Sequence, residues 1–273
     1  MSDEHGKGIV DIGSNGIRFG LVSSLSRHLP VIYEERAPIS LFEAQYSGTK
    51  LIPIPEHIIV DVINSLTRFK LLSQFYKVND VRVLATEATR TAPNSDDFRS
   101  RIYNATGWEI ELLSKDDEAK ISAMGIIATY YGVEGLVMDM GGGSVELNYV
   151  IHHPKDGTIK TSDFPINLPY GAAALTKLLN EADKPRKRHE LFKLIKNDLE
   201  KGLKKLNPPK HIEDEHGGFT VYMCGGGLRS LGYLSMSEFE SETSKSSKHK
   251  ITYPIPIING YGISAKELAR ITN

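Results

Sequence analysis

The sequence has few cysteines and no long apolar run, the features that mark secreted disulfide-rich proteins and membrane proteins. Its 273 residues include a single cysteine, Cys224, so no disulfide can form within the chain and a reducing compartment fits. No apolar run approaches the roughly 20 residues that span a bilayer, and the polar N-terminus has no signal or transit pattern. We therefore expect a cytoplasmic protein with no membrane partner, in which Cys224 is a small buried hydrophobe rather than a nucleophile.

Neither sign of charge is in excess. The chain has 33 Lys and Arg residues against 34 Asp and Glu residues, for a net charge of −1 at pH 7. This balance argues against a nucleic-acid partner or an acidic membrane surface. The P-loop, the Cys/His spacing of zinc sites and the serine nucleophile elbow are also missing. With 40% hydrophobic and 25% charged residues, we expect an ordinary globular core in one or two domains.

A glycine-rich motif stands out in what the sequence does contain. Residues 136–151 read as an apolar strand, an acid, three glycines and a second strand with alternating apolar residues. Backbone N–H groups in such a turn form a nest for phosphate oxygens. Asp139 ends the first strand, and Glu146 shares a face with Ser144, so both acids could hold a hard cation. An ordinary hairpin, whose glycines only turn the chain, would show the same pattern.

The motif occurs twice. Residues 9–22 have the same order of apolar strand, acid (Asp11), glycine (Gly13), small polar residues and second strand. A third glycine turn begins at Gly225, again after an apolar run. The two acids lie about one modest domain apart. We therefore predict two related α/β halves, residues 1–128 and 129–273, that face one phosphate-bearing ligand across a cleft.

Hydrophobic periodicity between the motifs indicates alternating strands and helices, in the order βββαβαβα in the first half and in a shorter version of it in the second. Ser114 with Asp117, and Ser264 with Glu267, have the spacing of capping boxes. The expected helices are 58–72, 96–107, 116–128, 172–179, 185–203 and 228–234, with one more after Ser264. The expected strands outside the glycine hairpins are 31–38, 81–86, 108–113, 158–165 and 219–223. Residues 241–250, rich in Ser and Lys, are expected to form a loop.

Three acids and an arginine could carry phosphoryl chemistry, which needs mainly positioning and charge neutralisation. Glu118, in the first turn of a helix after a strand, is the candidate general base that would activate water. Asp139 and Glu146 would hold Mg²⁺, and Arg90, after a short buried strand, would clamp phosphate oxygens. Two plainer interpretations stay open, in which Glu118 only pairs with its helix dipole and Arg90 forms a surface salt bridge with Glu87.

Four motifs in this order resemble those of the exopolyphosphatase/guanosine-pentaphosphate phosphatase (Ppx/GppA) family, and the likeness runs over nearly the whole chain. They are DIGSN from Asp11, ATEATR from Ala85, DEAK from Asp117 and DMGGGSVE from Asp139. Further segments are similar to a fungal group of retrograde regulation proteins within that family. They include TGW at 106–108, LPYGA at 168–172, GGGLR at 225–229 and INGY at 258–261.

The resemblance implies two actin-like (ASKHA, ribonuclease H-like) domains with the site between them, and Mg²⁺-dependent hydrolysis of a terminal phosphoanhydride of polyphosphate or a nucleotide. By position, Glu118 matches the family's base, Asp139 and Glu146 its metal-side acids, and Arg90 its phosphate arginine. The fungal group implies mitochondria-to-nucleus signalling with protein partners. The phosphate-binding candidates are Asp11, Gly13, Ser14, Asn15, Gly141, Gly142, Gly143, Ser144, Gly226, Gly227 and Arg229.

The sequence also departs from the family pattern. Gly16 replaces a serine and so removes a phosphate-binding hydroxyl, and Lys115 replaces a glycine in the loop that presents Glu118. Asp117 and Val145 replace a glutamate and a threonine. The changes at Gly16 and Lys115 favour an alternative in which the chain is a regulatory sensor that binds phosphate ligands and acts through partners. A kinase-like phosphotransferase is a third interpretation, and the helical C-terminal domain of long family members is expected to be absent.

Overall fold

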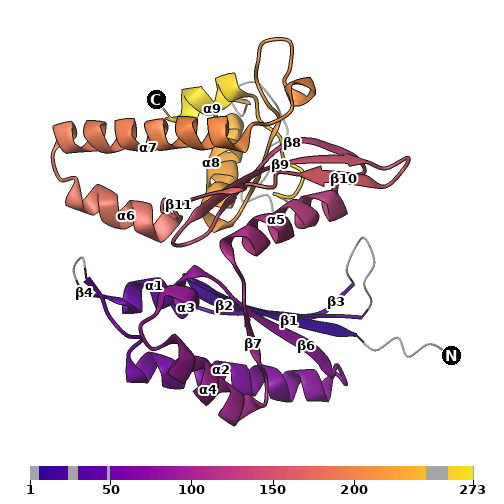
Figure 1. The fold of residues 1–273 in the computed structure, drawn as a ribbon, viewed down its shortest axis with the longest axis vertical. Helices are drawn as coiled ribbons and strands as arrows, with labels where there is room; N and C mark the ends of the chain where they lie inside the picture. The colour runs from indigo at the N-terminus through magenta and orange to yellow at the C-terminus, as the bar shows by residue number, and fades with distance from the viewer. Residues whose placement is uncertain (1–5, 24–29, 48–49, 244–257, 273) are drawn as a thin grey trace.

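The computed structural model describes residues 6–23, 30–47, 50–243 and 258–272. Two α/β halves lie one above the other, each built on a five-stranded sheet (Figure 1). The first half contains β1 (Lys7–Gly13), β2 (Gly16–Val22), β3 (Val31–Ala37), α1 (Leu41–Ala44), β4 (Tyr46–Ser47), β5 (Lys50–Leu51), α2 (Glu56–Phe75), β6 (Asp80–Ala85), α3 (Glu87–Thr91), α4 (Ser95–Thr106) and β7 (Ile110–Leu112).

The remaining elements follow β7. They are α5 (Lys115–Thr129), β8 (Val133–Met140), β9 (Val145–His153), β10 (Thr158–Thr161), β11 (Ile166–Leu168), α6 (Ala172–Glu181), α7 (Pro185–Leu206), a short 3₁₀ turn (Lys210–Ile212), β12 (Val221–Cys224), α8 (Gly226–Thr243) and α9 (Ala265–Thr272). None of the helices in the described part of the chain is long and apolar enough to cross a bilayer.

The first sheet has the order β3-β2-β1-β6-β7, with β1, β6 and β7 parallel and the other pairs antiparallel. Helices α2 and α4 cover the face turned away from the second half (Figure 1). Leu66 and Phe69 of α2 are fully buried, and Phe69 stacks on Phe19 of β2 with ring centroids 4.6 Å apart. Burying side chains of this size contributes about 1.5–3 kcal/mol each, so this face anchors the sheet and leaves the other for the site.

The second sheet repeats this plan with the order β10-β9-β8-β12, and β11 pairs with β9. In both sheets an antiparallel hairpin is followed by a parallel strand beside its first strand, β6 beside β1 and β12 beside β8. Asp11 lies opposite Arg18 in one hairpin, and Asp139 lies opposite Glu146 in the other. The fold is thus the predicted pair of actin-like domains.

Helix α5 packs against the second sheet rather than the first. Its Ala123 belongs to a buried cluster with Val137 and Val150, while alternate residues of the same strands, such as Leu136 and Leu147, pack on the opposite side. Helix α7 contributes Leu206 to that opposite side (Figure 1). Helix α5, predicted as part of the first half, thus packs on the second sheet, and the domain boundary at residue 128 stays a prediction.

Most predicted elements are present, and both capping boxes form. The prediction missed α1, α3, the β4–β5 hairpin and β11, because such short elements show too little periodicity. Helix α8 extends well beyond its predicted end at residue 234. The loop predicted at 241–250 overlaps the end of α8 at 241–243, and the rest of it lies outside the described residues.

Candidate active site

A cavity of about 430 Å³ lies between the two halves, and all three glycine turns line it. Asp11 and Asp139 both face it, as the repeated hairpins predict. Of the candidate residues, only Arg90 and Arg229 are not among those that line it. The lining residues are Asp11, Gly13, Ser14, Asn15, Gly16, Arg18, Arg36, Thr86, Glu87, Glu118, Asp139, Met140, Gly141, Gly142, Gly143, Ser144, Glu146, Ala172, Gly225, Gly226, Gly227 and Ser230.

The glycine turn after β8 is held from behind by the start of α6. The N–H groups of Ala172 and Ala173 donate to the carbonyls of Gly141 and Gly142, both at 2.9 Å, and Gly171 N–H donates to the Gly143 carbonyl at 3.2 Å. These bonds satisfy the helix N–H groups that have no partner within the helix. Within the described residues, the N–H groups of Gly142 and Gly143 donate no hydrogen bond. The turn can therefore offer them to an anion.

The two hairpin turns touch each other across the cavity. A Cβ at Gly142 would lie 3.0 Å from Ser14 Cβ and 3.1 Å from Asn15 Cβ, and one at Gly143 would lie 2.6 Å from a carboxylate oxygen of Glu87. Only glycine lets the backbones approach so closely. Both turns consequently line the same small part of the cavity, and the two halves meet there.

Asp139 and Glu146 are held by neighbouring side chains. Ser122 of α5 donates to Asp139 at 2.5 Å, while Ser144, at 2.5 Å, and Asn167 both donate to Oε1 of Glu146. Burial is the main cause that raises the pKa of Glu146, to about 7, against the weaker opposite effect of the Ser144 bond. Burial likewise raises the pKa of Asp11, with Arg18 opposing and Asp139 adding to the shift. A cavity with this many carboxylates favours the binding of a cation or the protonation of some of the carboxylates.

Glu118 lines the cavity from the first turn of α5 and is paired with Arg90. Arg90 Nη1 donates to Glu118 Oε1 at 2.6 Å and also to the Leu113 carbonyl, and both side chains are largely buried. Burial raises the pKa of Glu118, with Arg90 opposing this shift. The surface salt bridge considered between Arg90 and Glu87 is wrong, because the guanidinium reaches α5 instead.

Arg229 also lies apart from the cavity. It sits in the first turn of α8, is exposed, and is not on the helix face shared by Gly226 and Ser230, which are four residues apart and line the cavity. Cys224 packs beside Asp139, and burial raises its pKa to about 12, so it stays a protonated thiol as expected.

Sequence reasoning missed three charged residues of the cavity, Glu87, Arg18 and Arg36. Glu87 begins α3 at the carboxyl end of β6, and its buried Oε2 has no partner among the described residues. Arg18 and Arg36 lie in cross-strand register with each other and, through Arg18, with Asp11. The hairpin register, which places residues directly opposite on one face of a sheet, is the signal that could have found them.

The donor set suits a hard cation with few protein ligands. Carboxylate oxygens are the ligands that Mg²⁺ prefers, and it commonly takes only one or two of them alongside water and substrate phosphates. Among the described residues, no three acidic, His or Cys side chains are close enough together to hold a metal. The buried, unpartnered Glu87 Oε2 is one oxygen that a cation or its water could satisfy.

Ionisation of Glu146 should make stability depend on pH. Its pKa is about 7 in the folded chain against an ordinary value of 4.5, so the folded state binds the proton more tightly. The contribution of Glu146 to the free energy of unfolding is most favourable below about pH 4.5. It is lost as the pH rises through 7, which lowers the stability of the fold by about 3 kcal/mol. Glu146→Gln is therefore expected to be more stable than wild type at pH 8 but not at pH 4.

Urea unfolding of both proteins with a chelator present tests this expectation. Glu109→Gln, on an exposed side chain, is the matched control and should leave the pH profile unchanged. A stability gain for Glu146→Gln that is the same at both pH values would contradict the assignment.

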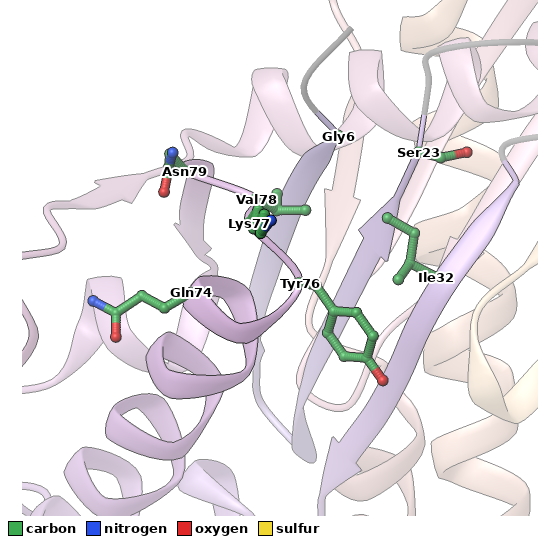
Figure 2. Close-up of a pocket in the computed structure, with 8 residues that line it drawn as sticks. All are labelled: Gly6, Ser23, Ile32, Gln74, Tyr76, Lys77, Val78 and Asn79. Carbon is green, nitrogen blue, oxygen red and sulfur yellow. The ribbon is translucent and has the colours of Figure 1, made fainter.

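A second cavity, of about 610 Å³, lies in the first half beside the end of α2 (Figure 2). Its lining has one charged side chain and no acid, so it lacks equipment for phosphoryl chemistry. The lining residues are Gly6, Ser23, Ile32, Gln74, Tyr76, Lys77, Val78 and Asn79.

Known proteins resemble this chain in both sequence and fold. The sequence model of the Ppx/GppA phosphatase family matches residues 21–268. Retrograde regulation protein 2 of Saccharomyces cerevisiae is 37% identical over 97% of this chain and 44% of its own length. Exopolyphosphatase 1 of Mycobacterium tuberculosis is 27% identical over 66% of this chain and 51% of its own. The chain thus spans about half the length, or less, of these relatives.

Solved structures share the fold at lower identity. An exopolyphosphatase from Cytophaga hutchinsonii superposes with a TM-score of 0.66 at 19% identity, over 88% of this chain and 74% of that one. A PPX-GPPA enzyme from Aquifex aeolicus gives 0.63 at 23% identity, over 85% and 72%. A family model covering most of the chain, a relative at 37% identity and this shared fold lead to one conclusion. The chain belongs to the Ppx/GppA phosphatase family.

Proposed function

We propose that this chain hydrolyses the terminal phosphoanhydride of polyphosphate or of a nucleotide polyphosphate. The observation that carries the proposal is the position of Glu118, largely buried, on the same cavity as the glycine turns and beside Arg90. A base, unsatisfied N–H donors and a cluster of carboxylates in one volume are the parts that phosphoryl transfer to water requires. Family membership supports the same class of reaction.

Glu118 would accept the proton of the attacking water. Burial raises its pKa, which strengthens it as a base, while the bond from Arg90 keeps the carboxylate oriented and favours its charged form. Arg90 then acts as a positioning residue, because its guanidinium contacts Glu118 and Leu113. The phosphate clamp expected from the sequence stays a prediction.

The glycine turns would bind the phosphate oxygens. The N–H groups of Gly142 and Gly143 are the donors best placed for this, and Ser14 and Asn15 bring the other turn to the same volume. Ser144 has its hydroxyl committed to Glu146, so its contribution would come from its backbone. Asp139 and Glu146 would hold Mg²⁺, which supplies positive charge against the phosphate oxygens.

Phosphate release tests the proposal directly. Polyphosphate, ATP, GTP and guanosine pentaphosphate are each offered with Mg²⁺ or with EDTA, and release is expected from at least one substrate with Mg²⁺ only. No release from any of them, despite tight binding of one, would overturn the hydrolase and favour the sensor. The same panel identifies the substrate.

Asp139→Asn should reduce both turnover and the gain in ligand affinity that Mg²⁺ gives, because the cation loses a charged oxygen partner. Its amide keeps an oxygen that can accept the Ser122 bond, so the fold should hold. Calorimetric titration of ligand with and without Mg²⁺ measures the difference. Binding that gains equally from Mg²⁺ in both proteins would remove Asp139 from the metal site.

Retrograde signalling is a second proposed aspect of the function, supported by the similarity to the yeast protein named for it. Partner proteins would sense ligand occupancy through closure of the two halves. In the sensor alternative, Gly16 and Lys115, which depart from the family pattern, account for weak chemistry with retained binding. Lys115 is the exposed first residue of α5, three positions before Glu118.

A further inference from the structure

Arg36 of β3 is seated against Gly16. A Cβ at Gly16 would lie only 2.9 Å from Arg36 Nε and 3.2 Å from its Nη2. Arg36 Nη2 donates to the Asn15 carbonyl at 2.8 Å, which fixes the guanidinium beside the first hairpin turn. Gly16 also has a φ of +153°, in a region that side chains rarely adopt. Gly16 is thus the residue that makes room for an arginine in the cavity.

Arg36 has no ion pair with a carboxylate among the residues that the structure describes. Other arginines of the first half are paired, such as Arg82 with Glu111 and Arg101 with Glu56. Arg18 lies directly opposite Arg36 on β2 and also forms no ion pair among these residues, although it interacts electrostatically with Asp11. Like charges directly opposite on neighbouring strands repel each other. An anion between or beside them would relieve this repulsion.

We infer that Arg36 binds a phosphate group of the ligand and determines specificity for ligands with more than one phosphate, an inference that rests on the proposed function. Arg36 lines the same cavity as Glu118, but its guanidinium is held by the Asn15 carbonyl at the turn of the first hairpin, whereas Asp139 and Glu146 belong to the second hairpin. Arg36 therefore binds a different phosphate of the ligand from the one that lies at the carboxylates. The planar guanidinium has N–H groups left over from its Asn15 bond, which suits bidentate contact with phosphate.

Calorimetry with tripolyphosphate and with orthophosphate tests the inference, in a Glu118→Gln background that blocks turnover. Arg36→Ala is expected to weaken tripolyphosphate binding roughly 10- to 100-fold, the range for losing a hydrogen bond to a charged group. Orthophosphate binding should change by less than about twofold, as for any ligand that does not reach the lost group. Arg82→Ala removes the same charge from the same face of the sheet and should change neither.

Three results would count against it. Equal weakening of both ligands, or unchanged tripolyphosphate binding by Arg36→Ala, overturns the role of Arg36 and leaves the proposed function standing. Failure of tripolyphosphate, longer polyphosphate, ATP, GTP and guanosine pentaphosphate to bind any version of the chain overturns the proposed function and this inference with it.

A double-mutant cycle checks the seating of Arg36 independently of ligand. Gly16→Ser should destabilise the chain less in an Arg36→Ala background than in the wild type, because the contact with the guanidinium is then gone. The backbone strain at Gly16 is common to both backgrounds and cancels in the cycle. Equal destabilisation in both would show that Gly16 does not make room for Arg36.

Discussion

Replacing Glu118 with Gln is expected to lower the rate of phosphate release by about 10²–10⁴-fold, the usual cost of losing a general base. The amide keeps the size of the side chain and an oxygen that can accept the Arg90 bond, but it cannot take a proton from water. A lost base affects the transition state more than ground-state binding, so ligand affinity should stay within a few-fold. Steady-state phosphate release and calorimetry together separate the two effects.

Asp116→Asn is the matched control for this variant. Asp116 lies two residues earlier in the same helical turn, but it is exposed and does not line the cavity. Its replacement removes the same charge and should leave turnover unchanged. If Glu118→Gln keeps wild-type turnover, the general base is another residue. Glu87, which also lines the cavity and whose Oε2 has no partner among the described residues, becomes the first candidate.

Gly225→Ala is expected to destabilise the fold by about 2–5 kcal/mol, the sum of a left-handed backbone penalty and a forced contact. Gly225 has a φ of +90°, and an added Cβ would lie 2.1 Å from the Met140 carbonyl oxygen and 2.8 Å from Asp139 Oδ1. Relief would push β12 away from β8 at the point where Asp139 enters the cavity. Urea unfolding and ligand binding should therefore both be impaired.

The neighbouring glycine provides the control. A Cβ at Gly226 would meet nothing within 4 Å, and its backbone is not left-handed. Gly226→Ala, at the start of α8, should be neutral or slightly stabilising, because alanine is the better helix former. Equal effects at the two positions would show that the close approach of Gly225 to β8 is not what stabilises this turn.

The position of the cavity could be predicted because its parts are local. Each of the two hairpin glycine turns, the acid before it and the strand after it lie within about a dozen residues, so hydrophobic alternation and turn chemistry reveal them. The Ser114 capping box fixed the start of α5 and with it the place of Glu118 in the first turn. These features are determined by neighbouring residues and do not depend on how the halves meet.

For other residues, the contacts in the tertiary structure differ from those that the sequence suggested. Arg90 and Glu87 are near each other in sequence, which suggested a salt bridge, yet Arg90 pairs with Glu118 of a later helix and Glu87 faces Gly143 of the other half. Helix α5 follows the first sheet in sequence but packs its apolar side chains on the second. Neither outcome follows from periodicity, since each depends on which buried surface offers the better packing.

The sequence by itself determined the two α/β halves, their glycine turns and the acids that end the strands, because strand, turn and cap preferences act over a few residues. Only the tertiary structure decided how the halves approach, which carboxylates become buried and how far their pKa values rise, and that Arg36 fills the space beside Gly16. Desolvation and charge pairing depend on distances between elements that are far apart in the chain, and those distances exist only once the fold has formed.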